Sequence, residues 1–207
     1  FYLNIERVYA IINIIGYRVS IRFLTQRRLS LMKQLNIGII GAGRIGKVHA
    51  QSITYNVPTA KVLGITDVFK DGLQELADKY GIEKVYNDYK EMLADEEIDA
   101  VLVCSSTDTH ADISIEAAKA GKHVFCEKPV TINYALSKEM ADEANARGKI
   151  LNIGVCNRYH KSVEMLREMN ERGEFGNIYH VYCSFRAHRG IPGLGGAFTT
   201  KAQSGGG

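Results

Sequence analysis

Six consecutive residues, Gly41-Ala42-Gly43-Arg44-Ile45-Gly46, have the spacing G-x-G-x-x-G between an apolar run and a helical pattern. Where such a loop follows a strand, the first glycine allows a tight turn and the second lets the backbone approach a pyrophosphate. The third lets the helix pack closely on the strand, and the amides at the helix N-terminus favour anionic phosphates. The spacing therefore predicts a dinucleotide-binding turn, to which we assign Gly41, Ala42, Gly43, Arg44, Ile45 and Gly46.

The same glycines allow two other interpretations. One is a tight strand–helix turn that binds nothing. The other is a nucleoside-triphosphate P-loop, because the segment from Gly41 to Lys47 matches the first seven positions of that motif. Its eighth position is Ser or Thr, whose hydroxyl binds magnesium, whereas Val48 has no hydroxyl. Val48 therefore argues against a P-loop.

A carboxylate ends the second predicted strand. Asp67 lies 21 residues after Gly46, where an acid in this kind of unit binds the hydroxyls of the adenosine ribose. Because a carboxylate repels a 2′-phosphate, Asp67 favours NAD over NADP as the cofactor. Lys70 lies close enough to keep NADP open as the less favoured alternative. The glycine loop and Asp67 together favour a dinucleotide site over a turn without a ligand.

Polar residues also follow the apolar runs at 100–103 and 123–126. Nucleotides bind beyond the carboxyl ends of parallel strands, and small polar side chains there do not block a dinucleotide. His110 stands one helical step later and also fits a solvated residue at a helix start. We assign this edge of the cofactor site to Ser105, Ser106, Thr107 and His110.

Glu127-Lys128-Pro129 close the run at 123–126. Proline disfavours a helical conformation for its predecessor, so we expect Lys128 to stay extended at the mouth of the sheet. An amine that is desolvated there has a lowered pKa and exchanges a proton with an alcohol or carbonyl near neutral pH. We therefore predict that Lys128 is catalytic. The alternative is a surface lysine paired with an acid.

Short apolar runs alternate with helical patterns through the middle of the chain. The predicted strands and helices are strands 35–40, 61–65, 100–103, 123–126 and 150–153, and helices 110–120 and 133–147. Strand–helix alternation over this length predicts an α/β fold, a Rossmann-type doubly wound parallel sheet covered on both faces.

A different pattern begins near residue 156. One more helix is predicted at 159–172, and the alternation over 179–186 has the period of a half-exposed strand in an antiparallel sheet. One such strand cannot form a stable sheet alone. We therefore predict a Rossmann domain at 32–155 and, at 156–207, the beginning of a truncated α+β domain with an antiparallel sheet.

Composition excludes several classes of protein. The chain is 45% hydrophobic and 24% charged with 3 prolines, which indicates a globular protein rather than a disordered one. Residues 1–34 carry +5 of charge and the remainder −2, so the body has no basic excess for nucleic acid. The four cysteines form no CxxC pair and the histidines lack metal-ligand spacing. We predict free thiols, no metal site and a cytoplasmic protein.

The first thirty-one residues carry most of the positive charge. Their apolar run, Val8 to Tyr17, is too short to span a bilayer, which needs about 20 apolar residues. Basic residues mostly follow this run, whereas a signal peptide has them before it. The first methionine is Met32, and we expect residues 1–31 to be a non-native or disordered extension. A membrane-surface anchor is the alternative; we predict no membrane partner.

Residues 121–129, with the sequence GKHVFCEKP, together with the glycine loop and Asp67, resemble the Gfo/Idh/MocA family of glucose–fructose oxidoreductase and myo-inositol dehydrogenase. The similarity covers about residues 33 to 207. It implies an NAD(P)-binding Rossmann domain followed by an open antiparallel sheet that carries substrate specificity and often the subunit interface. It also implies that Lys128 is the catalytic lysine of the EKP motif. The residues added to the cofactor site are Glu127, Lys128, Asn157 and Arg158, the last two beside the nicotinamide.

The resemblance implies an NAD-dependent oxidoreductase that transfers hydride between a cyclitol, sugar or sugar derivative and nicotinamide, as a homo-oligomer in its full-length form. The family completes its site with an Asp and a His after a glycine-rich stretch like Ser204–Gly207, where this sequence ends. We therefore expect the chain as given to be an inactive fragment. The alternative is a non-catalytic NAD(H)-binding module or regulatory subunit. A Rossmann dehydrogenase of amino-acid biosynthesis is a third option, but it would lack the EKP segment.

Overall fold

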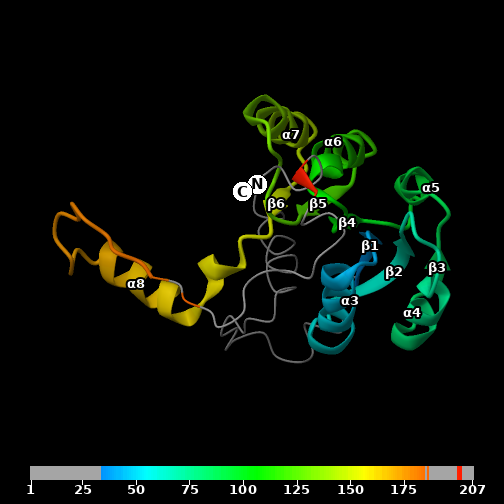
Figure 1. Ribbon diagram of the computed structural model, residues 1–207, viewed down its shortest axis with the longest axis horizontal. Coiled ribbons are helices and arrows are strands. Elements are labelled where there is room, and N and C mark those ends of the chain that lie inside the picture. Colours follow the sequence, from blue (N-terminus) through cyan, green and yellow to red (C-terminus); the bar gives the residue numbers. More distant parts are fainter. Residues whose placement is uncertain (1–33, 185, 187–199, 202–207) are drawn as a thin grey trace.

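A six-stranded parallel sheet forms the centre of the protein (Figure 1). The computed structural model describes residues 34–184, 186, 200 and 201. The strands are β1 (Leu35–Ile40), β2 (Ala60–Thr66), β3 (Lys84–Val85), β4 (Ala100–Val103), β5 (His123–Cys126) and β6 (Leu151–Ile153). Their order is β3-β2-β1-β4-β5-β6, and every pairing is parallel. The predicted α/β fold with a doubly wound sheet is confirmed.

Helices cover both faces of the sheet (Figure 1). One face carries α3 (Arg44–Asn56) and α4 (Leu73–Tyr80), and the other carries α5 (Tyr89–Ala94), α6 (His110–Lys119) and α7 (Tyr134–Ala146). Further along the chain lies α8 (Lys161–Glu171), and two short 3-10 helices lie at Thr107–Thr109 and Cys156–Tyr159.

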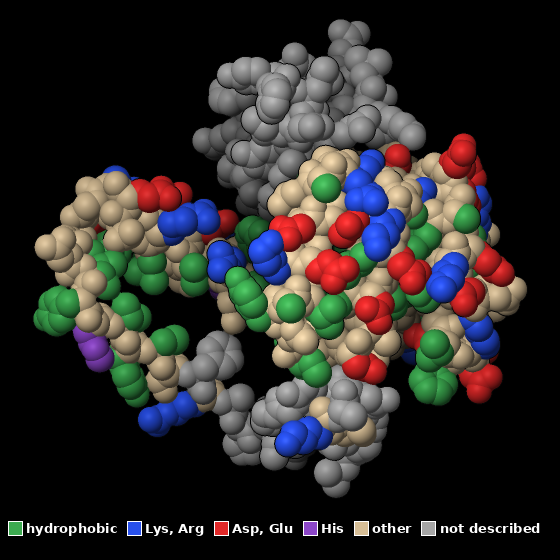
Figure 2. Space-filling view, turned by 90° about the horizontal axis from the view of Figure 1, so that it is seen from above, with side chains coloured by type: hydrophobic (Ala, Val, Ile, Leu, Met, Phe, Trp, Pro, Cys, Tyr) green, Lys and Arg blue, Asp and Glu red, His purple; other side chains and the backbone are tan. Residues whose placement is uncertain are grey.

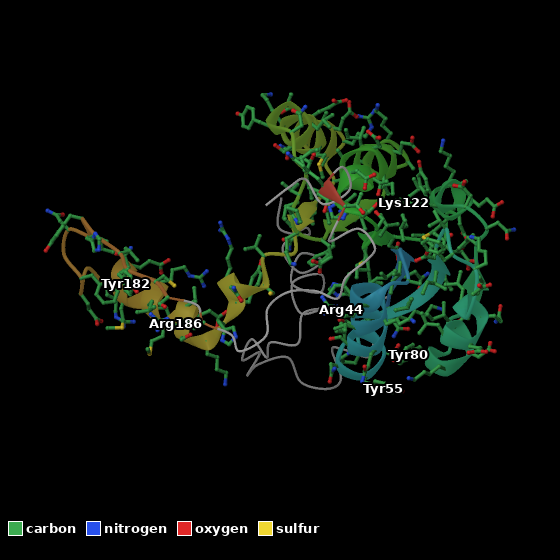
Figure 3. All side chains as sticks on the ribbon, in the orientation of Figure 1. Arg44, Tyr55, Tyr80, Lys122, Tyr182 and Arg186 are labelled. Atoms are coloured by element: carbon green, nitrogen blue, oxygen red, sulfur yellow. The ribbon has the colours of Figure 1, made fainter. Side chains whose placement is uncertain are left out.

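The alternation of side chains along each strand divides the core into two layers. Ile37 and Ile39 of β1 pack beneath α3 and α4, whereas Ile40 belongs to the cluster on the opposite face. Tyr55 of α3 and Tyr80 of α4 meet edge to face with their ring centroids 6.1 Å apart (Figure 3). These contacts fix α3, whose N-terminus adjoins the glycine loop.

The strand order reverses between β1 and β4, which are neighbours in the sheet. From β1 the chain crosses to β2 on one side, and from β4 it crosses to β5 on the other. The loops that leave the carboxyl ends of these two strands therefore diverge, which is where open α/β sheets bind their ligands. All the candidate residues between Gly41 and Lys128 follow the carboxyl ends of β1, β2, β4 or β5.

The strand predicted at 179–186 is not formed in the part of the chain that the structure describes. Residues 178–184 have neither helix nor strand structure, and Tyr179 is 97% exposed. A strand needs a partner for its backbone hydrogen bonds, and the described sheet has its edge at β6 instead. Figure 2 shows hydrophobic side chains gathered along α8 and this segment. The antiparallel domain at 156–207 stays a prediction.

Within the described ranges, no helix combines the length and apolar character that crossing a membrane requires.

Candidate functional site

The glycine loop joins β1 to α3, and its first and third glycines are required by close backbone contacts. Gly41 has φ +101°, and a Cβ there would lie 2.6 Å from the carbonyl carbon of Cys104. A Cβ on Gly46 would lie 2.0 Å from the carbonyl oxygen of Gly41. Gly46 is buried, whereas Gly43, Arg44 and Ile45 are exposed at the start of α3. The loop therefore folds back on itself and leaves its middle part open.

Gly43 is the glycine of this loop that has open space beside it, as far as the described residues go. A Cβ built on it meets no atom of the described structure within 4 Å, and its φ of −64° is ordinary for any residue. Neither packing nor backbone strain therefore explains a glycine here. A bare backbone with free space above it is what close approach of a pyrophosphate needs.

The Asp67 carboxylate ties the end of β2 to the glycine loop. Its Oδ2 accepts a hydrogen bond from the amide of Ala42 at 2.5 Å, and its Oδ1 accepts one from the amide of Phe69 at 2.8 Å. Two carboxylate oxygens offer about four acceptor sites, so capacity for hydroxyl donors is left. Asp67 thus sets the position of the loop and remains able to bind a ribose.

Lys70 follows closely but directs its ammonium group at the backbone. Its Nζ donates to the carbonyl oxygens of Asp67 and Asn87, both at 2.6 Å, and lies 3.4 Å from that of Tyr86. A lysine has three donors and no acceptor. Its ammonium group is thus engaged at the ends of β2 and β3.

A cavity of about 190 Å³ opens between the glycine loop and the segment that connects β2 to α4. It is lined by Ala42, Gly43, Lys47, Asp67, Phe69, Asp71, Gly72, Leu73 and Leu76. The apolar leucines give it a floor, and two carboxylates give it acceptors. This combination suits a flat ring system that carries hydroxyl groups.

The polar residues after β4 lie beside the same loop. The amide of Cys104 donates to the carbonyl oxygen of Ile40 at 2.7 Å, so β4 and β1 end side by side at the same edge of the sheet. Ser105, Ser106 and Thr107 follow, all half-buried. The structure therefore brings these three residues to the crevice edge where the sequence predicts them.

His110 has a different place from the one expected. It is 1% exposed, with Nε2 3.1 Å from the carbonyl oxygen of Ser105 and Nδ1 2.8 Å from that of Pro129. Both ring nitrogens are engaged by the protein, because the ring lies between two loops instead of facing the opening. His110 is thus better described as a link between the β4 loop and the Lys128 turn than as a cofactor contact.

The turn after β5 presents Lys128 and buries Glu127. The amide of Glu127 donates to the carbonyl oxygen of Val103 at 2.9 Å, which continues the strand pairing, and the Lys128–Pro129 peptide is cis. Lys128 is exposed, so the predicted desolvation of its amine is not found. Burial ends at Glu127, and the next residue already lies on the open carboxyl edge of the sheet.

The Glu127 carboxylate pairs with a histidine that sequence analysis did not single out. Its Oε1 lies 2.8 Å from Nε2 of His49, and both side chains are at least 90% buried. One pattern in the sequence indicates that His49 is buried. The residues of α3 that recur at helical spacing and form its buried face are Gly46, His49, Ala50 and Ile53.

The cysteines nearest the turn are inert. Burial raises the pKa of Cys104, and it raises that of Cys126 to about 12, so both thiols stay protonated. No group of three potential metal ligands occurs among the residues that the structure describes. Asn157 and Arg158 are exposed just beyond β6, at the same edge of the sheet as Lys128.

Comparison with known proteins adds a family match. A family model described as "Oxidoreductase family, NAD-binding Rossmann fold" (GFO_IDH_MocA) matches residues 35–155. Myo-inositol 2-dehydrogenase from Thermotoga maritima is 43% identical over 152 residues, which are 73% of this chain and 45% of that protein. D-glucoside 3-dehydrogenase from Escherichia coli is 36% identical over 174 residues, 84% of this chain and 49% of that protein.

Solved structures agree with this match. Scyllo-inositol dehydrogenase from Lactobacillus casei, with bound NAD(H) and scyllo-inositol, has a TM-score of 0.66 and 29% identity, covering 70% of this chain and 43% of that one. A probable dehydrogenase from Thermotoga maritima has a TM-score of 0.65 and 44% identity, covering 69% and 42%. The chain spans about half the length of the curated relatives it matches.

Proposed function

Because the chain belongs to the Gfo/Idh/MocA family of oxidoreductases with an NAD-binding Rossmann fold, we propose that it holds NAD(H) along the carboxyl edge of the sheet. In this proposal it serves a dehydrogenase of cyclitols, sugars or sugar derivatives. The observation that carries the proposal is the open backbone at Gly43 beside the Asp67 carboxylate. The relatives named myo-inositol 2-dehydrogenase and D-glucoside 3-dehydrogenase support the substrate class.

The residues present fit a dinucleotide. Gly43 and the first amides of α3 would hold the pyrophosphate, whose charge the helix dipole favours. The Asp67 carboxylate would accept the hydroxyls of the adenosine ribose, and the cavity that Asp67 and Phe69 help to line would take the adenosine. Ser105 to Thr107 and the Lys128 turn would hold the nicotinamide end.

The charges around the cavity favour NAD over NADP. Asp67 and Asp71 both line it and repel a 2′-phosphate, and they outnumber Lys47, the one cation among its lining residues. Lys70, the nearby cation that kept NADP open, is engaged by backbone carbonyl oxygens. A phosphate-binding site would need its ammonium group free.

Lys128 serves the reacting hydroxyl group. NAD, when bound, supplies a hydride acceptor at the nicotinamide C4. The Lys128 amine stands exposed at the same edge of the sheet and donates a hydrogen bond to the substrate oxygen. This contact would stabilise the negative charge on the oxygen when its proton leaves toward solvent, and that charge would be consumed in forming the C=O bond as hydride leaves the carbon.

Calorimetric titration with NADH and NADPH tests the cofactor part of the proposal. We expect NADH to bind the 207-residue chain and NADPH to bind more weakly. Asp67→Ala weakens NADH binding roughly tenfold or more, because a carboxylate that accepts two ribose hydroxyls contributes about 1.5–3 kcal/mol. Asp142→Asn is the matched control, since it removes an exposed carboxylate on α7. A folded chain that gives no heat with either nucleotide would contradict the proposal.

A further inference from the structure

His49 and Glu127 form a buried pair that connects α3 to the end of β5. Nε2 of His49 and Oε1 of Glu127 are 2.8 Å apart, with side-chain exposures of 7% and 10%. The His49 ring also packs edge to face on Phe125, with centroids 5.4 Å apart. The ring is therefore held by the sheet as well as by the carboxylate.

The Glu127 carboxylate also contacts the backbone of Lys128. Its second oxygen, Oε2, accepts a hydrogen bond from the backbone amide of Lys128 at 3.1 Å. One carboxylate thus bridges the helix that begins at the glycine loop and the residue that carries the exposed amine. The chain His49–Glu127–Lys128 is continuous.

The carboxylate has little freedom to adopt another position. A Cβ on Gly154 would lie 3.2 Å from Cδ, Oε1 and Oε2 of Glu127, so the absence of a side chain there leaves room for the carboxylate and little more. The amide of Gly154 donates to the carbonyl oxygen of Cys126 at 2.8 Å, which holds that wall in place. The niche fits the observed rotamer of Glu127.

The pair is also favourable in charge. Burial by itself raises the pKa of Glu127, but the hydrogen bond and charge of His49, with the amide and charge of Lys128, lower it below its ordinary value. Two thiols that sense the charge of Glu127, those of Cys104 and Cys126, stay protonated. The carboxylate is therefore ionised at neutral pH and holds its donors strongly.

We propose that His49 is a positioning residue for Lys128: through the Glu127 carboxylate it fixes the backbone of the residue whose amine meets the substrate. The role of that amine rests on the proposed function, but the mechanical link does not. A buried pair of polar side chains often contributes little net stability compared with well-packed apolar side chains. A role in geometry accounts for this pair better than a role in stability alone.

Amide hydrogen exchange followed by NMR tests the link, because two adjacent amides report different things. The Lys128 amide bonds to the Glu127 carboxylate, whereas the Glu127 amide bonds to Val103 in the sheet. In His49→Leu we expect exchange at the Lys128 amide to speed up roughly tenfold, the loss of about one strong hydrogen bond, with the Glu127 amide nearly unchanged. His49→Gln keeps a donor at the end of its side chain and restores slow exchange.

Acylation of the Lys128 amine by acetic anhydride, read by mass spectrometry, tests the consequence. In the wild-type chain NADH slows acylation of Lys128, and this shielding is lost in His49→Leu and kept in His49→Gln. If NADH fails to shield Lys128 in the wild type, the proposed function is wrong, and the amide exchange still judges the role of His49.

Two results would overturn the role of His49. One is an unchanged Lys128 amide in a folded His49→Leu chain, which would show that the carboxylate keeps its place without the imidazole. The other is equal acceleration at the Lys128 and Glu127 amides, which would make the pair a support of the whole sheet. If His49→Leu does not fold, His49→Met, which also removes the donor but fills the site with a more adaptable apolar side chain, gives the same comparison of the two amides.

Discussion

Two glycines of one loop should respond to the same substitution in opposite ways. In Gly43→Ala the new methyl group meets no described atom within 4 Å, and the backbone conformation suits alanine. We expect the free energy of unfolding to change by less than about 1 kcal/mol. The methyl group occupies the space above the loop, so NADH binding weakens by roughly 10- to 100-fold, the loss of one or two charge-assisted amide–phosphate hydrogen bonds.

Gly46→Ala should do the reverse. Its methyl group would lie 2.0 Å from the carbonyl oxygen of Gly41, a backbone atom that cannot rotate away. We expect a loss of about 3 kcal/mol or more in the free energy of unfolding, since overpacking of a close backbone contact has no cheap relief. Urea denaturation and NADH fluorescence titration on both variants measure the two quantities. Wild-type affinity in Gly43→Ala, or wild-type stability in Gly46→Ala, would refute the reasoning.

Three further predictions address stability and the amine. Contacts lower the pKa of Asp95 to about 2, and the hydrogen bond from Lys84 is the largest of them. The ionised Asp95 therefore stabilises the folded protein above pH 3.8, and this contribution disappears as the pH falls toward 2. Asp95→Asn should therefore lower the free energy of unfolding by on the order of 1 kcal/mol at pH 7 and by much less at pH 2. Urea denaturation at the two pH values measures this difference, and an equal loss at both would contradict the prediction. His110→Leu removes the imidazole that lies between two carbonyl oxygens and leaves at least one of them without its donor, so it should reduce the free energy of unfolding by roughly 2 kcal/mol in the same assay. An unchanged midpoint would show that the link is dispensable. Lys128→Ala should leave NADH affinity within about threefold by calorimetry, because its amine serves the substrate, and a larger loss would place the amine on the cofactor.

Much of the fold follows from local pattern. The runs at 35–40, 100–103 and 123–126 are strands with those bounds, since buried parallel strands show as continuous apolar stretches. The two residues of β3 are too few to give such a signal. The alternation at 179–186 has the period of a strand, but pairing depends on a partner that sequence period does not report.

The residues of the candidate site also differ in whether local sequence pattern predicts them. The placement of Gly43 and Asp67 beside one another was predictable, because it follows from backbone spacing within one strand–helix–strand unit. His49 and His110 depend on contacts between residues 78 and 19 positions apart, respectively, which no local pattern encodes. The sequence likewise does not show which of the two adjacent residues, Glu127 or Lys128, has the buried side chain. In the structure Glu127 is buried and Lys128 is exposed.

In the proposed function, NAD(H) lies over the carboxyl edge of the sheet, from Asp67 to Lys128. Amide chemical shifts recorded by NMR during titration with NADH test it most directly. The amides of Gly43, Phe69 and Lys128 should shift together, while that of Lys122, at the amino end of β5, should stay unchanged. Shifts confined to the amino edge, or no shifts at saturating NADH, would contradict it.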